Sequence, residues 1–190
     1  MARALATALK APLVSSTISR LLIDLNRTIG HPQLYSPVTR VLPANLRAEI
    51  AAGHYQPYWS QVEGLISRSV SRGRRVIHIS SHSFTPVLNG QLRRADVGLL
   101  YDPGRPGEAG LCARWQAALG ENAPALRVRR NYPYHGKSAG LTSQLRQRFP
   151  PGAYLGIELE INQRIVFAAA RQWTALRSQL IQSLRAASAG

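Results

Sequence analysis

The sequence predicts an α/β fold of three layers, α/β/α, with a mixed central sheet. Segments with the period of a helix alternate with short apolar runs typical of strands along most of the chain. A chain of 190 residues can bury a substantial core. Its composition of 45% hydrophobic and 17% charged residues is that of a folded globular protein. No shift in composition or long linker divides it, so we expect a single domain over residues 1–190.

Prolines and glycines mark the limits of the elements in the first half of the chain. Pro12 ends the first helix, Pro43 suits the first turn of another, and Gly73 suits the position after a last helical turn. The elements expected there are a helix over 2–9, extended segments over 13–18 and 21–25, helices over 43–54 and 55–72, and a strand over 76–83.

The second half alternates between strand and helix. Short apolar runs predict the strands, helical periodicity predicts the helices, and Asp102-Pro103-Gly104 predicts a turn. The elements expected there are a strand over 97–101, a helix over 107–119, a strand over 126–130, a helix over 141–149, a strand over 154–161 and a terminal helix over 165–184.

Charge is the most extreme feature of the composition. The chain has 24 basic and 9 acidic residues, and only Lys10 and Lys137 are lysines. This excess suits a surface that binds phosphates of nucleic acid, but arginines scattered over solvated faces give the same total. The densest clusters, within residues 72–75 and 127–130, lack the glycines and aromatic residues of an RNA-recognition motif. Nucleic-acid binding therefore stays an alternative that these clusters do not favour.

Cysteine usage and hydropathy indicate the compartment. Cys112 is the single cysteine, it falls inside a predicted helix, and we expect a core thiol in a cytoplasmic protein. No apolar run approaches the roughly 18 residues that span a bilayer. The first residues read as a short helix rather than a signal peptide.

The strand VIHISSHSF, residues 76–84, carries unusual side chains. Alternation places His78, Ser80 and His82 on one face, and His82 lies at the carboxyl end, where open α/β sheets place ligands. A neutral imidazole there can bind zinc or act as a base. The alternative is a partly buried histidine with structural hydrogen bonds only.

A second unusual strand is YLGIELEINQ, residues 154–163, in which Glu158 and Glu160 share a face of an otherwise apolar segment. A carboxylate held near a metal-bound water can serve as a general base. The alternative is a solvated face or an ion pair with one of the many arginines.

Asn26 and Arg27 lie just past the apolar run at 21–23. The planar guanidinium of Arg27 suits a substrate carboxylate, and Asn26 adds a donor and an acceptor. The alternative is a structural role, in which Asn26 turns the chain and Arg27 pairs with Asp24 or with solvent.

Five sequence blocks in this order resemble the N-formylglutamate amidohydrolase family over about residues 2–163. They are SRLLIDLNR (19–27), SSHSFTPVLNG (80–90), RRADVGLLYDP (93–103), LRVRRNYPYHG (126–136) and YLGIELEINQ (154–163). The resemblance implies a phosphorylase/hydrolase-like, zinc carboxypeptidase-like fold, followed here by a C-terminal helix over 164–190.

The same resemblance implies a zinc-dependent hydrolase that removes an N-formyl or other short N-acyl group from glutamate or a similar amino acid. Asn26 and Arg27 match the pair that holds the substrate carboxylate, His82 matches a zinc ligand, and Glu158 matches the catalytic carboxylate. The implied partner is a small N-acyl amino acid, and neither a membrane nor nucleic acid is expected.

Two departures from the family pattern set further expectations. The upstream segment with the other metal ligands, a histidine followed three residues later by an acidic or polar ligand, has no counterpart here, and the chain opens with a helix where a strand is usual. We therefore expect an N-terminally shortened form that retains little zinc. If the chain does bind zinc tightly, His78 and His135 are the candidates to complete the site. Ala139 stands where the family has an aspartate. Beside the enzyme and the nucleic-acid-binding protein, a third hypothesis is therefore an inactive relic that keeps the amino-acid pocket.

Overall fold

The computed structural model describes residues 1–189. The chain forms two compact units. The sheet unit comprises Met1–Ala11, Ile77–Ser138 and the chain from Leu155 onward, and the helical unit comprises Pro12–Val76 and Ala139–Tyr154. None of the helices in the described range combines the length and the hydrophobicity needed to cross a bilayer. The expected single domain over residues 1–190 stays a prediction.

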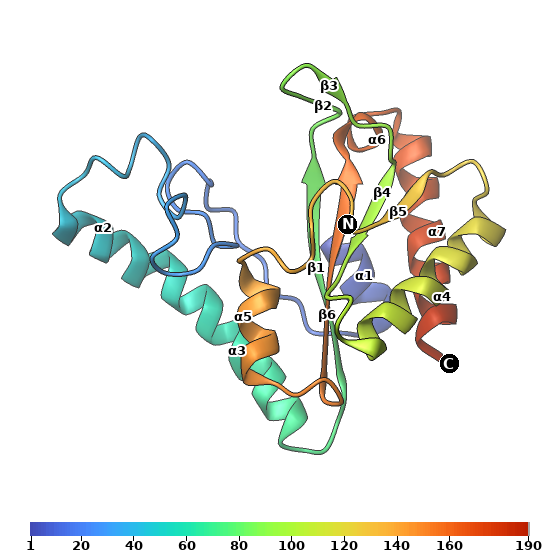
Figure 1. The fold of residues 1–190 in the computed structure, drawn as a ribbon, viewed down its shortest axis with the longest axis horizontal. Coiled ribbons are helices and arrows are strands. Elements are labelled where there is room, and N and C mark those ends of the chain that lie inside the picture. The colour runs from blue at the N-terminus through green and yellow to red at the C-terminus, as the bar shows by residue number, and fades with distance from the viewer. Residues whose placement is uncertain (190) are drawn as a thin grey trace. The chain divides into compact units, whose positions relative to one another are not determined.

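A four-stranded mixed sheet is the frame of the sheet unit (Figure 1). Its strands, in spatial order, are β1 (Val76–Phe84), β6 (Tyr154–Asn162), β4 (Val97–Leu100) and β5 (Val128–Arg130). Strand β4 runs antiparallel to β6 and parallel to β5. The predicted strands thus form within two residues of their expected limits, and the expected α/β class with a mixed sheet is confirmed.

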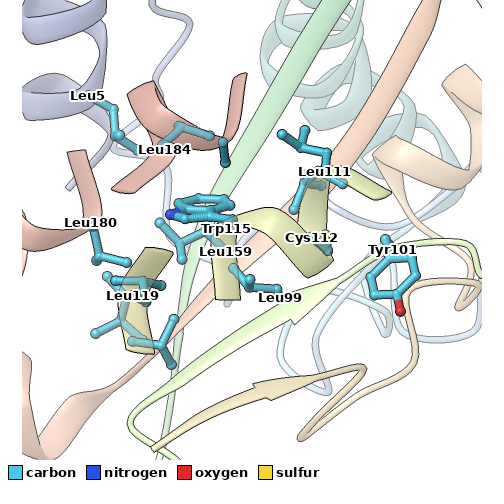
Figure 2. Packing of buried hydrophobic residues seen from close by; sticks show 14 of the residues in the cluster. Leu5, Leu99, Tyr101, Leu111, Cys112, Trp115, Leu119, Leu159, Leu180 and Leu184 are labelled. Carbon is cyan, nitrogen blue, oxygen red and sulfur yellow. The ribbon is translucent and has the colours of Figure 1, made fainter. Parts of the chain in front are cut away.

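Three helices pack against one face of this sheet and enclose the main core (Figure 2). They are α1 (Ala2–Leu9), α4 (Pro106–Asn122) and α7 (Ala170–Ala189). Leu159 of β6 points into this core, where Trp115 and Leu180 are fully buried. Burial of large apolar side chains at this interface is the main favourable contribution to the stability of the unit. Cys112 is fully buried in the same cluster, which confirms the expected core thiol.

The C-terminal helix expected over 165–184 is wrong in one respect, because the structure divides it. A short helix, α6 (Gln163–Val166), precedes α7, and the Asn162 side chain caps it by accepting a hydrogen bond from Arg164 N at 3.0 Å. The helical path ends at Phe167 before α7 begins. No proline or glycine in this segment signals the break.

A hairpin adds to the predicted elements of the sheet unit. Strands β2 (Val87–Leu88) and β3 (Gln91–Leu92) pair antiparallel across Asn89 and Gly90, which adopt positive φ angles of 50° and 75°. An Asn-Gly pair is a strong signal for such a turn, and it is present in the sequence.

The helical unit contains α2 (Ala44–Ile50), α3 (Gln56–Val70) and α5 (Leu141–Arg148). A π-helical turn, Ala51–Tyr55, joins α2 to α3, so the two predicted helices are continuous. Pro43 precedes the first helical residue and Gly73, at φ 71°, follows the last turn, as expected. Apolar side chains of α3 and α5 form one cluster of this unit: Val62, Ile66, Leu141, Leu145.

The extended segments expected over 13–18 and 21–25 are wrong, because the structure has turns and irregular chain there. Short polar side chains provide an alternative to sheet hydrogen bonds. Ser19 Oγ accepts from Leu21 N at 3.1 Å, and Asp24 Oδ1 accepts from Asn26 N at 3.0 Å. Within the apolar run, Ile23 is nevertheless fully enclosed in a second cluster of the helical unit, whereas Leu21 is exposed.

Candidate active site

His82 and Glu158 lie on the same face of neighbouring strands in the sheet unit. In β1, Ile77 and Ile79 pack against the main core, so alternation places His82 on the opposite face. In β6, Leu159 enters the same core, so Glu158 also lies on the opposite face. Strands β1 and β6 are adjacent. We call this side of β1 and β6 the polar face.

The two carboxylates of β6 are both buried on the polar face. Glu158 is 8% exposed and Glu160 is 5% exposed. Removing a carboxylate from water is costly, and such positions are typical of functional groups or of tightly bonded structural ones. A buried carboxylate with limited access to water is suited to act as a general base.

Glu160 lies beside a loop that contacts the polar face. In the β4–β6 register Gly98 is opposite Glu160. A Cβ atom on Gly98 would lie 2.0 Å from the carbonyl oxygen of Tyr132 and 3.3 Å from Cβ of Glu160. Only glycine therefore lets the Tyr132 carbonyl approach the sheet here. Glu158 lies opposite Leu100, one pleat away from this contact.

The loop Asn131–Gly136 is anchored to the carboxyl end of β4. Asn131 Oδ1 accepts hydrogen bonds from Tyr101 N at 3.0 Å and from Gly136 N at 3.1 Å. A Cβ atom on Gly136 would lie 2.2 Å from Tyr101 N, so no side chain fits there. These contacts make the loop Asn131–Gly136 a fixed boundary of the polar face.

A buried serine orients the His82 ring. Ser80 Oγ and His82 Nε2 are 2.8 Å apart, and both side chains belong to the polar face of β1. Because Ser80 is buried, this hydrogen bond restricts the rotation of the imidazole.

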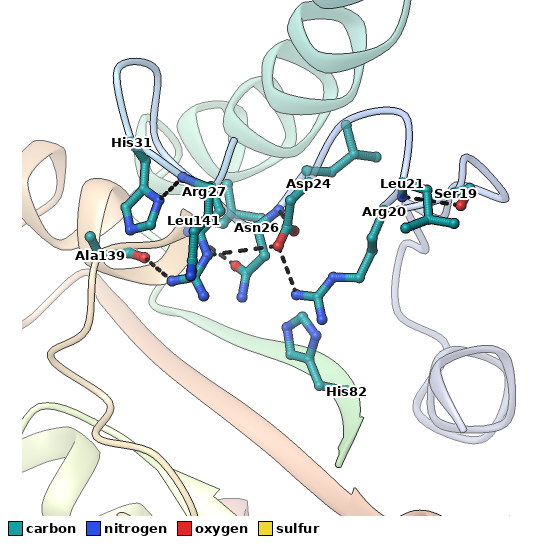
Figure 3. A network of polar contacts seen from close by, with 12 residues as sticks. Ser19, Arg20, Leu21, Asp24, Asn26, Arg27, His31, His82, Ala139 and Leu141 are labelled. Atoms are coloured by element: carbon teal, nitrogen blue, oxygen red, sulfur yellow. Dashed lines mark hydrogen bonds and ion pairs between the residues drawn. The ribbon is translucent and has the colours of Figure 1, made fainter. Parts of the chain in front are cut away.

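Asn26 and Arg27 lie in the helical unit, in a network of local polar contacts (Figure 3). Asp24 Oδ2 is 3.7 Å from Arg27 Nε, and Arg27 Nη1 donates to Ala139 O at 3.5 Å. Asn26 Oδ1 accepts from Leu141 N at 3.2 Å, at the first residue of α5. These contacts fix both side chains. Within residues 1–189, Asn26 Nδ2 and Arg27 Nη2 make no hydrogen bond.

Two aromatic residues hold the main chain of this segment in place. Tyr55 Oη donates to Arg27 O at 2.8 Å, and Trp59 Nε1 donates to Leu25 O at 2.9 Å. The two rings stack with centroids 5.0 Å apart. Burial raises the pKa of the Tyr55 phenol well above its usual value. The Asn26–Arg27 segment is therefore supported by uncharged donors.

The predicted site residues thus form two pairs, one in each unit. His82 and Glu158 share the polar face, and Asn26 and Arg27 share one network. The convergence of the two pairs on one substrate stays a prediction. Within residues 1–189 no three His, Cys, Asp or Glu side chains form a group that could hold a metal ion.

Glu108, which sequence reasoning missed, links three parts of the sheet unit. Its carboxylate is fully buried, accepts from Asp102 N at 2.9 Å and Gly156 N at 3.0 Å, and lies 3.4 Å from Arg105 Nε. Gly156 precedes Glu158 by two residues, so this contact helps to position β6. An acidic residue in the first turn of α4, after Pro106, is an ordinary N-terminal feature, and the sequence gives no sign of its burial.

The mixed sheet and its flanking helices define an α/β protein with a hydrolase-like fold. The chain belongs to the N-formylglutamate amidohydrolase family, whose model matches residues 1–167. It is similar to a solved structure, gene product Atu2144 from Agrobacterium tumefaciens, with 30% identity and a TM-score of 0.83 over 99% of this chain and 75% of that one. No curated protein gives a significant match to the sequence. The resemblance inferred from the sequence blocks is therefore confirmed.

Proposed function

We propose that this chain is an amide hydrolase that removes an N-formyl, or another short N-acyl, group from glutamate or a similar amino acid. One observation carries the proposal. In a member of the N-formylglutamate amidohydrolase family, the buried Glu158 lies on the same sheet face as His82. A carboxylate and an imidazole on one face of adjacent strands are a combination that serves hydrolysis.

In the proposed reaction, Glu158 removes a proton from water as the water oxygen bonds to the formyl carbon. Glu158 then gives the proton to the leaving nitrogen as the C–N bond breaks. The products are formate and the free amino acid, and Glu158 returns to its carboxylate form. The preference for Glu158 over Glu160 rests on the Tyr132 carbonyl, which approaches the sheet beside Glu160.

Arg27 and Asn26 are assigned to the substrate carboxylate. The Nη2 group of Arg27 and the Nδ2 group of Asn26 are donors without a hydrogen bond within residues 1–189. The contacts of both residues with Asp24, Ala139 and Leu141 hold these donors in a defined orientation. Preorganised donors bind a carboxylate at a smaller entropic cost than mobile ones.

Zinc is the proposed cofactor, and when bound it would polarise the amide oxygen and acidify a water molecule. The described residues do not fit a complete catalytic zinc site, because they form no group of three metal-ligating side chains. His82 is the proposed ligand from this chain. This shortage of ligands also supports a second candidate function, that of an inactive relic that still binds the amino acid.

A cytoplasmic location is part of the proposal, since the one cysteine is a buried thiol.

Release of formate from N-formyl-L-glutamate, followed by proton NMR with and without added zinc, tests the proposal. Formate accumulation with wild-type protein supports the enzyme, and saturation-transfer signals from the same ligand measure binding separately. Binding without formate under either condition would show that the second candidate is right. A protein that is folded but neither binds nor hydrolyses the ligand would contradict both.

A further inference from the structure

Arg93 is a buried arginine with an unusual set of partners. It follows the β2–β3 hairpin and is only 9% exposed. Its guanidinium carbon lies 5.1 Å from the centroid of the Tyr134 ring and 6.0 Å from that of Phe84, and Nη1 donates to Tyr134 Oη at 3.0 Å. Two rings and one hydroxyl therefore hold the guanidinium in place.

No carboxylate within residues 1–189 pairs with Arg93. The other buried arginine, Arg105, is 3.4 Å from the Glu108 carboxylate, which is the usual arrangement for a buried charge. Arg93 Nε and Nη2 make no hydrogen bond in the described chain, yet neither is among its fully buried unbonded atoms. These two donors are thus open to solvent on a side chain that is otherwise enclosed.

Arg93 lies at the end of the polar face. Its carbonyl oxygen accepts from Asn162 Nδ2 at 3.1 Å, and Asn162 falls on the same face of β6 as Glu158 by strand alternation. Phe84, whose ring centroid lies 6.0 Å from the guanidinium carbon, falls on the same face of β1 as His82. All five residues belong to the sheet unit.

We propose that Arg93 binds the side-chain carboxylate of the substrate and thereby makes the site selective for acidic N-acyl amino acids. This inference rests on the proposed function, in which the substrate is N-formylglutamate or a similar N-acyl amino acid. A guanidinium packed against two rings, with Nη1 bonded to Tyr134 Oη, presents Nε and Nη2 in the fork geometry that matches a carboxylate. A carboxamide of the same shape lacks the charge, so it gains less from this contact.

Binding of N-formyl-L-glutamate and N-formyl-L-glutamine, which differ in this one group, tests the proposal by calorimetry on the full chain. Wild-type protein is expected to bind the glutamate compound more tightly. Arg93→Met, which keeps apolar contact with both rings, is expected to weaken that binding by about 10- to 100-fold and to leave the glutamine compound within a few-fold. Arg93→Lys is expected to restore part of the preference.

Arg94→Met is the matched control, because Arg94 is the adjacent residue in sequence and is exposed. It should leave both affinities unchanged. Equal weakening of both compounds in Arg93→Met, or a preference that survives in it, would overturn the proposal. If Arg93→Met does not fold, the single variants Arg93→Lys and Tyr134→Phe replace it. Loss of the preference for the glutamate compound in Tyr134→Phe supports the assignment. An unchanged preference in both single variants overturns it.

The result of this binding test can be distinguished from the result of the formate-release test of the proposed function. A preference that depends on Arg93, in a protein that releases no formate, would refute hydrolysis and leave this assignment standing. Formate release by a wild-type protein that binds the two compounds equally would support hydrolysis and refute the assignment of Arg93. Failure of wild-type protein to bind either compound overturns the assignment.

Discussion

The side-chain amide of Asn162 donates a hydrogen bond to the main-chain carbonyl of Arg93 at 3.1 Å. A second bond from the same nitrogen reaches Ala95 O at 2.9 Å, and Asn162 is fully buried. One residue at the end of β6 therefore fixes the chain that leads from the hairpin into β4. The strand of the candidate base and the position of Arg93 are coupled through it.

Asn162→Ala is expected to lower the free energy of unfolding by about 1–3 kcal/mol, because it leaves two buried carbonyl groups without their donor and removes the cap of α6. Urea denaturation followed by circular dichroism measures the change. Gln163→Ala is the control, since that side chain makes only a 3.3 Å contact with the exposed Ser83. Equal losses in the two variants would contradict the role given to Asn162.

Glu108→Ala is expected to destabilise the sheet unit by about 3–5 kcal/mol, because it removes the carboxylate from two main-chain donors and from buried Arg105. The melting temperature measured by calorimetry should fall accordingly. Glu121→Ala, on the exposed part of the same helix, is expected to change stability by less than about 0.5 kcal/mol. A melting temperature unchanged by Glu108→Ala would refute the linking role of this carboxylate.

Local signals in the sequence were sufficient for most elements of the fold. The strand containing Glu158 and Glu160 and the helix containing Cys112 form where apolar periodicity predicts them. The segment around Ile23 shows why other predictions failed. Ile23 is buried as in a strand, but Leu21 is exposed, and the Asp24 side chain accepts a hydrogen bond from the main chain of Asn26 as in a turn. The periodicity of apolar residues indicates which side chains tend to be buried. It does not indicate which hydrogen bonds the main chain makes.

The candidate site was only partly accessible to sequence reasoning. Alternation places His82 and Glu158 on definite faces of their strands, and in the structure both lie on the polar face. Arg93 and Glu108 gave no signal, because both look like ordinary surface charges in the sequence. Their burial depends on contacts with residues 41 positions away, at Tyr134, and 48 positions away, at Gly156.

Stability of the helical unit is expected to fall as the pH rises above about 10, the usual pKa of tyrosine. Burial raises the pKa of Tyr55, so the folded chain keeps a phenolic proton that the unfolded chain releases. The contribution is complete below pH 10 and is lost as the pH increases above it. Unfolding by urea at several alkaline pH values measures the slope, which Tyr55→Phe should reduce. An unchanged slope would contradict this assignment.

The purified chain is expected to contain much less than one zinc per molecule, because one imidazole cannot retain the metal against water. Metal analysis by mass spectrometry after dialysis measures the content, and His82→Ala should remove the zinc that remains. About one tightly bound zinc per chain would show that another residue completes the site, and His78 and His135 are the candidates.

The central claim is that Glu158 is the base of an amide hydrolase, and formate release from N-formyl-L-glutamate by matched glutamine variants tests it most directly. With zinc added to the assay, Glu158→Gln is expected to lower the rate by about 10²- to 10⁴-fold while circular dichroism shows an intact fold. Glu160→Gln should have a smaller effect, and Glu121→Gln, at an exposed position, should have none. A larger loss in Glu160→Gln than in Glu158→Gln, or a Glu158→Gln variant as active as wild type, would contradict the claim.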